Sequence, residues 1–228
     1  MIDTSFLLTP VPEKEGEKFN GEGWGFSDPS NPSIIKMWET IKTKVNATSI
    51  FEVGMFAGHS TVMMLETFPF ATVTSFDPGQ FSRRAAVPIQ KRYPTRFIFW
   101  AVGIDKYEQR DPVDLDLMFI DGSHTYRHVK SDIQVMKRMQ PKWVLFDNIE
   151  LPDVRRAVKE AGLFKAELNP EYFFYVNTHK GNTQPGIFML VKLGRRYRMQ
   201  LHKEKGGYIP FSGRQEIEQG GIKTERVE

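Results

Sequence analysis

Several apolar runs in this chain stop abruptly at an acidic residue or a glycine. The clearest runs, each with the residues that follow it, are Ser49–Val53 before Gly54, Leu115–Ile120 before Asp121, and Trp143–Phe146 before Asp147 and Asn148. Short continuous apolar runs are typical of strands buried on both faces of a parallel sheet. Ligands of such sheets bind where the carboxyl ends of the strands meet. The runs therefore predict an enzyme site at this edge, suited to a nucleotide-like cofactor and to a metal.

Strands and helices alternate through most of the chain. Repeated alternation predicts a parallel sheet with helices on both faces, whereas residues 172–176 and 186–193 have the pattern of an antiparallel pair. We therefore expect an α/β fold with a doubly wound, mostly parallel, seven-stranded sheet that ends in an antiparallel hairpin. The other predicted strands are 71–76 and 96–101, and the predicted helices cover 60–68, 82–92, 125–139 and 152–161.

The chain divides into three parts by composition. Residues 1–32 are rich in proline, glycine and charge and predict an irregular arm that serves as a lid, with Trp24 and Phe26 among its aromatic residues. Residues 33–193 form the expected domain, and residues 194–228 form a polar tail.

Composition excludes some chemistry. The 228 residues contain no cysteine, which excludes disulfides, thiolate metal sites and a cysteine nucleophile. The formal net charge of +3 admits an anionic partner such as nucleic acid, but interspersed charges favour an ordinary, mildly basic protein. No apolar run is long enough to span a bilayer, and no secretory signal is evident, so we expect a cytoplasmic protein without membrane association.

The turn after the first strand predicts the type of cofactor. Gly54 and Gly58 allow a tight turn and close approach of a ligand, but their spacing differs from the dinucleotide pattern G-x-G-x-x-G. Asp77, 23 residues after Gly54, stands where an acidic residue accepts hydrogen bonds from ribose hydroxyls. The alternatives are a plain strand–helix turn and an Asx turn before Pro78.

Together these residues resemble the class I S-adenosylmethionine-dependent methyltransferases. The run from Leu117 to Tyr126 resembles the Methyltransf_24 type in particular, and the resemblance covers about residues 33 to 193. It implies that the two glycines pack under S-adenosylmethionine and that Glu52 lies near the methionine end. It also implies that Asp77 holds the ribose, that Asp105 lies beside the adenine amino group, and that Asp121 contacts the cofactor.

A second resemblance concerns a metal. Asp121, Asp147 and Asn148 are similar to the metal ligands of the catechol and caffeoyl-coenzyme-A O-methyltransferases. Their oxygen atoms suit Mg²⁺ or another small divalent cation, which would lower the pKa of an acceptor hydroxyl. The alternative is that Asp121 caps a helix and that Asp147 and Asn148 form a turn.

His124 lies three residues after Asp121, at a spacing where catechol enzymes carry a basic lysine. We predict that His124 and Asp121 are catalytic and that the histidine takes the hydroxyl proton; a histidine that only braces the next helix is the alternative.

The sequence predicts O-methylation of a small-molecule or sugar hydroxyl with help from a divalent metal. A metal-independent enzyme, a nucleic-acid methyltransferase and a catalytically silent cofactor-binding protein are the alternatives. The sequence does not decide whether the protein forms a homodimer.

Overall fold

The computed structural model describes residues 2–3, 5–7, 31–107, 114–164, 170–176, 186–193, 215–218 and 221–224. The seven-stranded sheet has the order β3-β2-β1-β4-β5-β7-β6. Its parallel strands are β1 (Ser49–Val53), β2 (Thr72–Phe76), β3 (Phe97–Trp100), β4 (Leu117–Ile120) and β5 (Trp143–Phe146). The strand β7 (Gly186–Lys192) runs antiparallel to both β5 and the edge strand β6 (Pro170–Val176).

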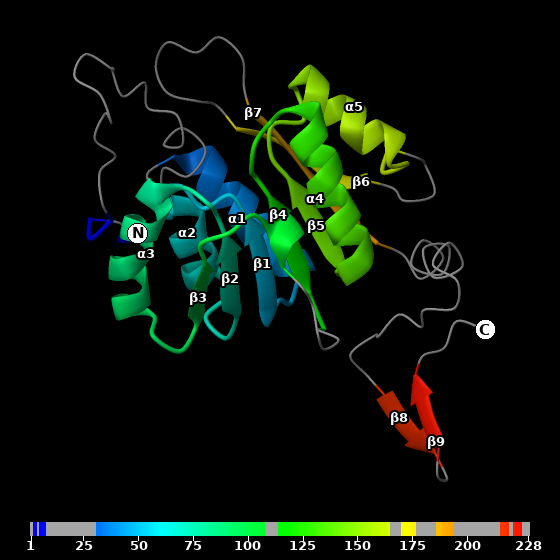
Figure 1. Cartoon of the computed structure of the whole chain (residues 1–228), viewed down its shortest axis with the longest axis horizontal. Coiled ribbons are helices and arrows are strands. Elements are labelled where there is room, and N and C mark those ends of the chain that lie inside the picture. The colour runs from blue at the N-terminus through cyan, green and yellow to red at the C-terminus, as the bar shows by residue number, and fades with distance from the viewer. Residues whose placement is uncertain are drawn as a thin grey trace.

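Helices cover both faces of this sheet (Figure 1). Figure 1 shows α1 (Pro32–Lys44), α2 (His59–Thr67) and α3 (Gln80–Arg92) on one side, and α4 (Tyr126–Met139) and α5 (Pro152–Glu160) on the other. A short 3₁₀ helix, η1 (Ile104–Lys106), follows β3. The helix α1 begins where the Asn31 side chain accepts a hydrogen bond from the Ser33 amide at 2.9 Å, and Pro32 occupies its first turn.

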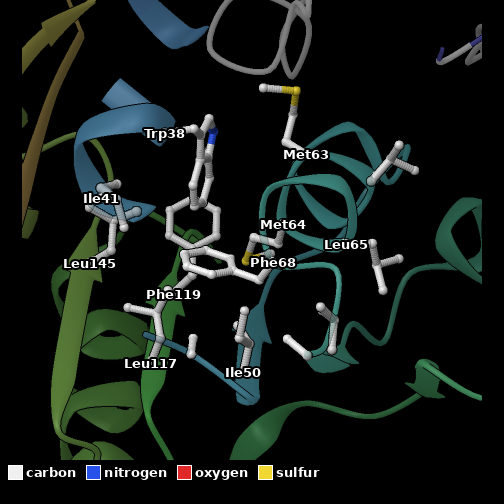
Figure 2. Packing of buried hydrophobic residues seen from close by; sticks show 14 of the residues in the cluster. Trp38, Ile41, Ile50, Met63, Met64, Leu65, Phe68, Leu117, Phe119 and Leu145 are labelled. Atoms are coloured by element: carbon white, nitrogen blue, oxygen red, sulfur yellow. The ribbon is translucent and has the colours of Figure 1, made fainter. Parts of the chain in front are cut away.

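Two hydrophobic clusters fill the space between the sheet and its helices. One lies under α1, α2 and α3, the other under α4 and α5. In the first, Trp38 of α1 meets Phe119 of β4 edge to face, with 6.2 Å between ring centroids (Figure 2). Phe119 also stacks on Phe188 of β7 at 6.4 Å. Aromatic side chains thus join α1 to the middle of the sheet.

The predicted fold class is confirmed: the sheet has seven strands, is mostly parallel and ends in an antiparallel pair. Helix and strand bounds differ from the predicted ones by at most two residues. In the predicted tail, β8 (Gln215–Glu218) and β9 (Gly221–Thr224) form a separate two-stranded sheet. Among the described residues, no helix is long and apolar enough to cross a membrane.

Part of the predicted arm packs against the domain. The ring of Phe6 lies 6.5 Å from that of Tyr93, and Asp3 pairs with Arg92 of α3 at 3.2 Å. The remaining arm, including Trp24 and Phe26, lies outside the described residues, so a role in closing the site stays a prediction.

Candidate functional site

The strand register brings the predicted acidic residues to one edge. Val53 pairs with both Phe76 and Ile120, and Ile120 pairs with Phe146, so β1, β2, β4 and β5 end level with one another. The next residues along the chain are Gly54, Asp77, Asp121 and Asp147. The four strand ends therefore lie together at one edge of the sheet.

Gly54 lets two of these turns touch. Its φ is +87°, a conformation that other residues rarely adopt. A Cβ at this position would lie only 2.0 Å from the backbone oxygen of Asp121. A side chain is therefore excluded here by both the backbone conformation and the space.

Gly58 has a similar conformation, with φ of +84°, where α2 begins. A Cβ there would meet the Cδ1 atom of Ile89 at 2.2 Å, and Leu7 would lie 3.9 Å away. Residues of the N-terminal arm thus reach the start of α2.

Glu52 is fully buried and held by three hydroxyl groups. Ser60 donates to its Oε1 at 2.5 Å, Thr61 donates to Oε2 at 2.6 Å, and Ser75 also donates to Oε2. Burial raises the pKa of Glu52 to about 7, although the three hydrogen bonds favour the ionised form. This carboxyl group joins β1 to α2 and β2 inside the protein, beneath the turn that contains Gly54 and Gly58.

Asp77 also has structural partners. Its Oδ2 accepts hydrogen bonds from the amides of Met55 and Phe56, each at 2.9 Å, and its Oδ1 accepts one from the Gly79 amide at 2.7 Å. The carboxylate thereby holds the turn after β1 in shape. A carboxylate has about four acceptor positions, so Asp77 can still accept from a ribose hydroxyl.

Asp121 and Asp147 form a coupled carboxyl pair. Their side chains interact through a hydrogen bond. Burial and the neighbouring negative charges raise the pKa of Asp121 to about 8, and burial together with the charge of Asp121 raises the pKa of Asp147 well above its ordinary value. At neutral pH this pair therefore retains at least one proton.

His124 stands beside this pair. Its Nε2 lies 3.4 Å from Oδ1 of Asp121, and 42% of its side chain is exposed. An imidazole with this exposure can meet both an incoming molecule and the carboxyl pair. The structure therefore places the predicted base and the predicted carboxylates together.

Asn148 is fixed by a residue that the sequence reasoning missed. Its amide nitrogen Nδ2 donates to Glu150 at 3.1 Å, and the other carboxylate oxygen of Glu150 accepts from the Ile187 amide at 2.9 Å. The Asn148 backbone amide donates to Asp147 at 2.6 Å. These bonds tie the end of β5 to the start of β7, a long-range contact that no local motif signals.

Asp105 lies apart from the carboxyl pair, on η1. Its side chain is 46% exposed and pairs with Lys106 at 3.3 Å. Burial, together with the charge of Asp105, raises the pKa of Asp132, a buried acid on α4. Sequence reasoning missed Asp132, whose only signal is an acidic residue on the apolar face of the helix.

The metal prediction is not confirmed. Within the part of the chain that the structure describes, no group of three or more His, Cys, Asp or Glu side chains is arranged to hold an ion. The predicted trio supplies two adjacent carboxyl groups and an amide, whose nitrogen is already bonded to Glu150.

Comparison with known proteins identifies the domain. Residues 51–149 match the family model Methyltransf_24, described as a methyltransferase domain. Residues 51–149 are thus similar to a methyltransferase domain. This match confirms the prediction of an S-adenosylmethionine-dependent methyltransferase enzyme.

Solved methyltransferase structures share the fold. A putative O-methyltransferase from Klebsiella pneumoniae has a TM-score of 0.55 and 14% identity, with 77% of this chain and 86% of that chain covered. The O-methyltransferase from Bacillus cereus, in complex with SAH, has a TM-score of 0.53 and 15% identity, covering 76% and 86%. TomG from Streptomyces achromogenes, in complex with SAM, has a TM-score of 0.51 and 16% identity, covering 70% and 79%. No curated protein sequence gives a significant match.

Proposed function

We propose that this methyltransferase transfers the methyl group of S-adenosylmethionine to a hydroxyl group of a small-molecule or sugar acceptor. The observation that carries the proposal is the Asp121–Asp147 carboxyl pair with His124 beside it, at the edge where Gly54 lets the turns after β1 and β4 come into contact. O-methylation needs a group that takes the hydroxyl proton, and this cluster offers one next to the cofactor turn.

The charge of the site suits this cofactor. S-adenosylmethionine carries a positive sulfonium and a positive ammonium group. Glu52, Asp77, Asp121 and Asp147 come from four strands, and their interactions show that they lie within electrostatic reach of one another. A bound cation favours the ionised forms of these carboxyl groups, and their attraction then stabilises the cation. Two of the similar structures contain SAH or SAM, which supports the same cofactor here.

The residues also define a reaction path for this proposal. The acceptor oxygen attacks the sulfonium methyl group, the carbon–sulfur bond breaks, and S-adenosylhomocysteine leaves. The hydroxyl proton passes to the imidazole ring of His124, whose Nε2 lies 3.4 Å from Oδ1 of Asp121. Glu52 and Asp77 hold the turn beneath the cofactor, and an acceptor fixed in line with the methyl group reacts faster.

The second part of the proposal is that the site binds a divalent cation. Asp121, Asp147 and Asn148 would hold it, and their hard oxygen atoms fit such an ion because the half-buried Asp121 and the buried Asp147 favour a proton or a cation between them. When bound, the ion would lower the pKa of the acceptor hydroxyl.

The first experiment is calorimetry with S-adenosylmethionine, S-adenosylhomocysteine and NAD. We expect the first two to bind and NAD not to bind; binding of neither would refute the proposed cofactor. Methyl transfer from labelled S-adenosylmethionine is then measured on panels of catechols, sugars and RNA oligonucleotides. Transfer to RNA alone, or transfer to a nitrogen, would contradict the proposed acceptor class.

Single substitutions distinguish the role of His124 from that of Asp147. His124→Gln should lower kcat and remove its dependence on the ionisation of the histidine, while SAH affinity changes little. Asp147→Asn should abolish turnover and, if an ion binds, also reduce binding of Mn²⁺ measured by electron paramagnetic resonance without acceptor. Glu39→Gln, an exposed change on α1, is the charge-matched control. Activity that survives EDTA, together with undetectable Mn²⁺ binding, would reject the metal and leave the methyl transfer in place.

A further inference from the structure

The turn after β5 contains a carboxylate on which two donors converge. Glu150 is half-buried and accepts one hydrogen bond on each oxygen atom, from the side-chain nitrogen Nδ2 of Asn148 at 3.1 Å and from the backbone amide of Ile187 at 2.9 Å. A carboxylate has no hydrogen to donate, so the end of the Asn148 amide that faces it must be the NH2 group. The chemistry of Glu150 thus settles which way the Asn148 amide is turned.

The joining of β5 to β7 does not by itself need a carboxylate at position 150. The two strands pair over four residues each, and beyond them the amide of Ile149 donates to the carbonyl oxygen of Ile187 at 2.9 Å. The Ile187 amide needs one acceptor, which the side-chain oxygen of a glutamine would also supply. Only the second bond, from Asn148, requires a side chain with two acceptor oxygens.

Asn148 is itself held in an uncommon conformation. Its φ is +54°, in the left-handed region that residues with a Cβ rarely adopt and that Asn and Asp tolerate best. The residue is buried, and its backbone amide donates to Oδ1 of Asp147 at 2.6 Å. Such conformations persist where the surroundings enforce them, and they concentrate at functional sites.

The two ends of a carboxamide differ in what they bind. Its oxygen accepts a hydroxyl hydrogen or contacts a cation, whereas its NH2 group can do neither. Because Glu150 holds the nitrogen of Asn148, the oxygen of the amide points away from Glu150. The proposed function needs an oxygen at Asn148, since both an acceptor hydroxyl and a divalent cation bind to oxygen.

We propose that Glu150 is a positioning residue for methyl transfer, which holds the Asn148 amide so that its oxygen, and not its nitrogen, faces the acceptor beside the carboxyl pair. The inference rests on the proposed function, which brings the acceptor to that pair. It adds to the residues at the strand ends a side chain that acts only through Asn148.

The test exchanges the two groups of the bond between Glu150 and Asn148. In Glu150→Gln one oxygen is left for two donors; it can keep the bond to the Ile187 amide, and the new NH2 group then meets the nitrogen of Asn148. The Asn148 amide should turn over, so that kcat falls about tenfold, the effect of one misplaced hydrogen-bonding group. The rate is measured with the catechol or sugar of the panel that reacts fastest. Calorimetry with S-adenosylhomocysteine should show an affinity within about twofold of the wild type, because the cofactor turn is unchanged.

The double variant Asn148→Asp with Glu150→Gln restores the pattern with the groups exchanged. The glutamine oxygen accepts from the Ile187 amide, the glutamine NH2 group donates to the new carboxylate at position 148, and the net charge is that of the wild type. An oxygen again faces the acceptor, so kcat should return to within about threefold of the wild type. Asn148→Asp alone sets two carboxylates against each other and should lose at least about tenfold in kcat.

Asp153→Asn is the matched control. The carboxylate of Asp153 accepts from the Tyr126 amide at 3.0 Å, a bond that an asparagine oxygen can keep, so this variant should retain the wild-type kcat.

Each outcome decides the inference. A wild-type kcat in Glu150→Gln would overturn it, because that variant keeps the bond to Ile187 and loses only the orientation of Asn148. A low kcat that the second substitution does not rescue would overturn it as well. If Glu150→Gln does not fold in a melting measurement, the double variant decides alone, and a double variant that is inactive or unfolded rejects the exchange. Absence of methyl transfer by the wild type to every member of the panel would instead refute the proposed function itself.

Discussion

The contact between Gly54 and Asp121 predicts a large effect of the smallest possible substitution. Gly54→Ala adds one methyl group at a position with φ of +87°, and a left-handed conformation costs a residue with a Cβ about 1–2 kcal/mol. The new carbon would also stand 2.0 Å from the Asp121 carbonyl oxygen, well inside the usual contact distance of about 3.5 Å. Overpacking of this kind adds about 1–3 kcal/mol. We therefore expect the free energy of unfolding to fall by about 2–5 kcal/mol.

Gly54→Ala should also lower the rate of methyl transfer. The atom that a Cβ at Gly54 would meet belongs to the backbone and cannot rotate away. The turn after β4 must therefore move by roughly 1 Å, and Asp121 moves with it. Misplacement of a reacting group by about 1 Å can reduce the rate by about 100-fold. Urea unfolding gives the stability change, and methyl transfer under conditions where the variant is folded gives the change in rate.

Gly58→Ala is the matched comparison. Gly58 has the same left-handed backbone conformation as Gly54. The atom that an added Cβ would meet, however, is the terminal Cδ1 of the Ile89 side chain. Removing that tip with Ile89→Val should recover part of the lost stability, so the double variant should be more stable than additivity predicts. No neighbouring substitution should rescue Gly54→Ala in this way. A Gly54→Ala protein within about 1 kcal/mol of the wild type, with unchanged turnover, would show that the two turns are not in close contact.

Two further predictions concern stability. The pKa of Glu52, about 7 against an ordinary 4.5, means that the folded state binds the extra proton between these values; stability should therefore fall as pH rises from about 4.5 to 7, by up to about 3 kcal/mol from this group. Unfolding of Glu52→Gln measured across this range should lack that part of the fall, and identical pH profiles for the two proteins would contradict the raised pKa. Phe119→Ala removes a ring that packs against both Trp38 and Phe188, so it should destabilise the protein by about 3–5 kcal/mol in urea unfolding, whereas Phe70→Ala at an exposed position should change stability by less than about 0.5 kcal/mol.

Local pattern predicts the sheet and the positions of the strand ends. The apolar runs Ser49–Val53 and Trp143–Phe146 are strands with those same bounds, because their burial on both faces leaves a continuous signal in the sequence. Alternation of strands and helices then brings Asp121 and Asp147 to adjacent strands without any knowledge of distant contacts.

Partnerships between distant residues could not be predicted in the same way. The sequence reasoning gave Glu52 and Asp77 cofactor roles; in the structure Glu52 also joins β1 to α2 and β2, and Asp77 also holds the turn after β1. Ser75 and Glu150 gain their importance only after the strands have paired, since each reaches a residue in another element. The bond of Asn148 to Glu150 likewise depends on packing that no short motif records.

The position of β7 has a consequence for the order in which this protein becomes complete during synthesis. Because β7 lies between β5 and β6, one edge of β5 stays unpaired until residues 186–192 have left the ribosome. The amide of Ile187 also supplies the bond that fixes Glu150, and through it Asn148. A nascent chain that already contains every acidic residue of the site therefore still lacks its finished geometry. Catalytic activity should therefore appear only after β7, the last strand of the seven-stranded sheet along the chain, has paired with β5.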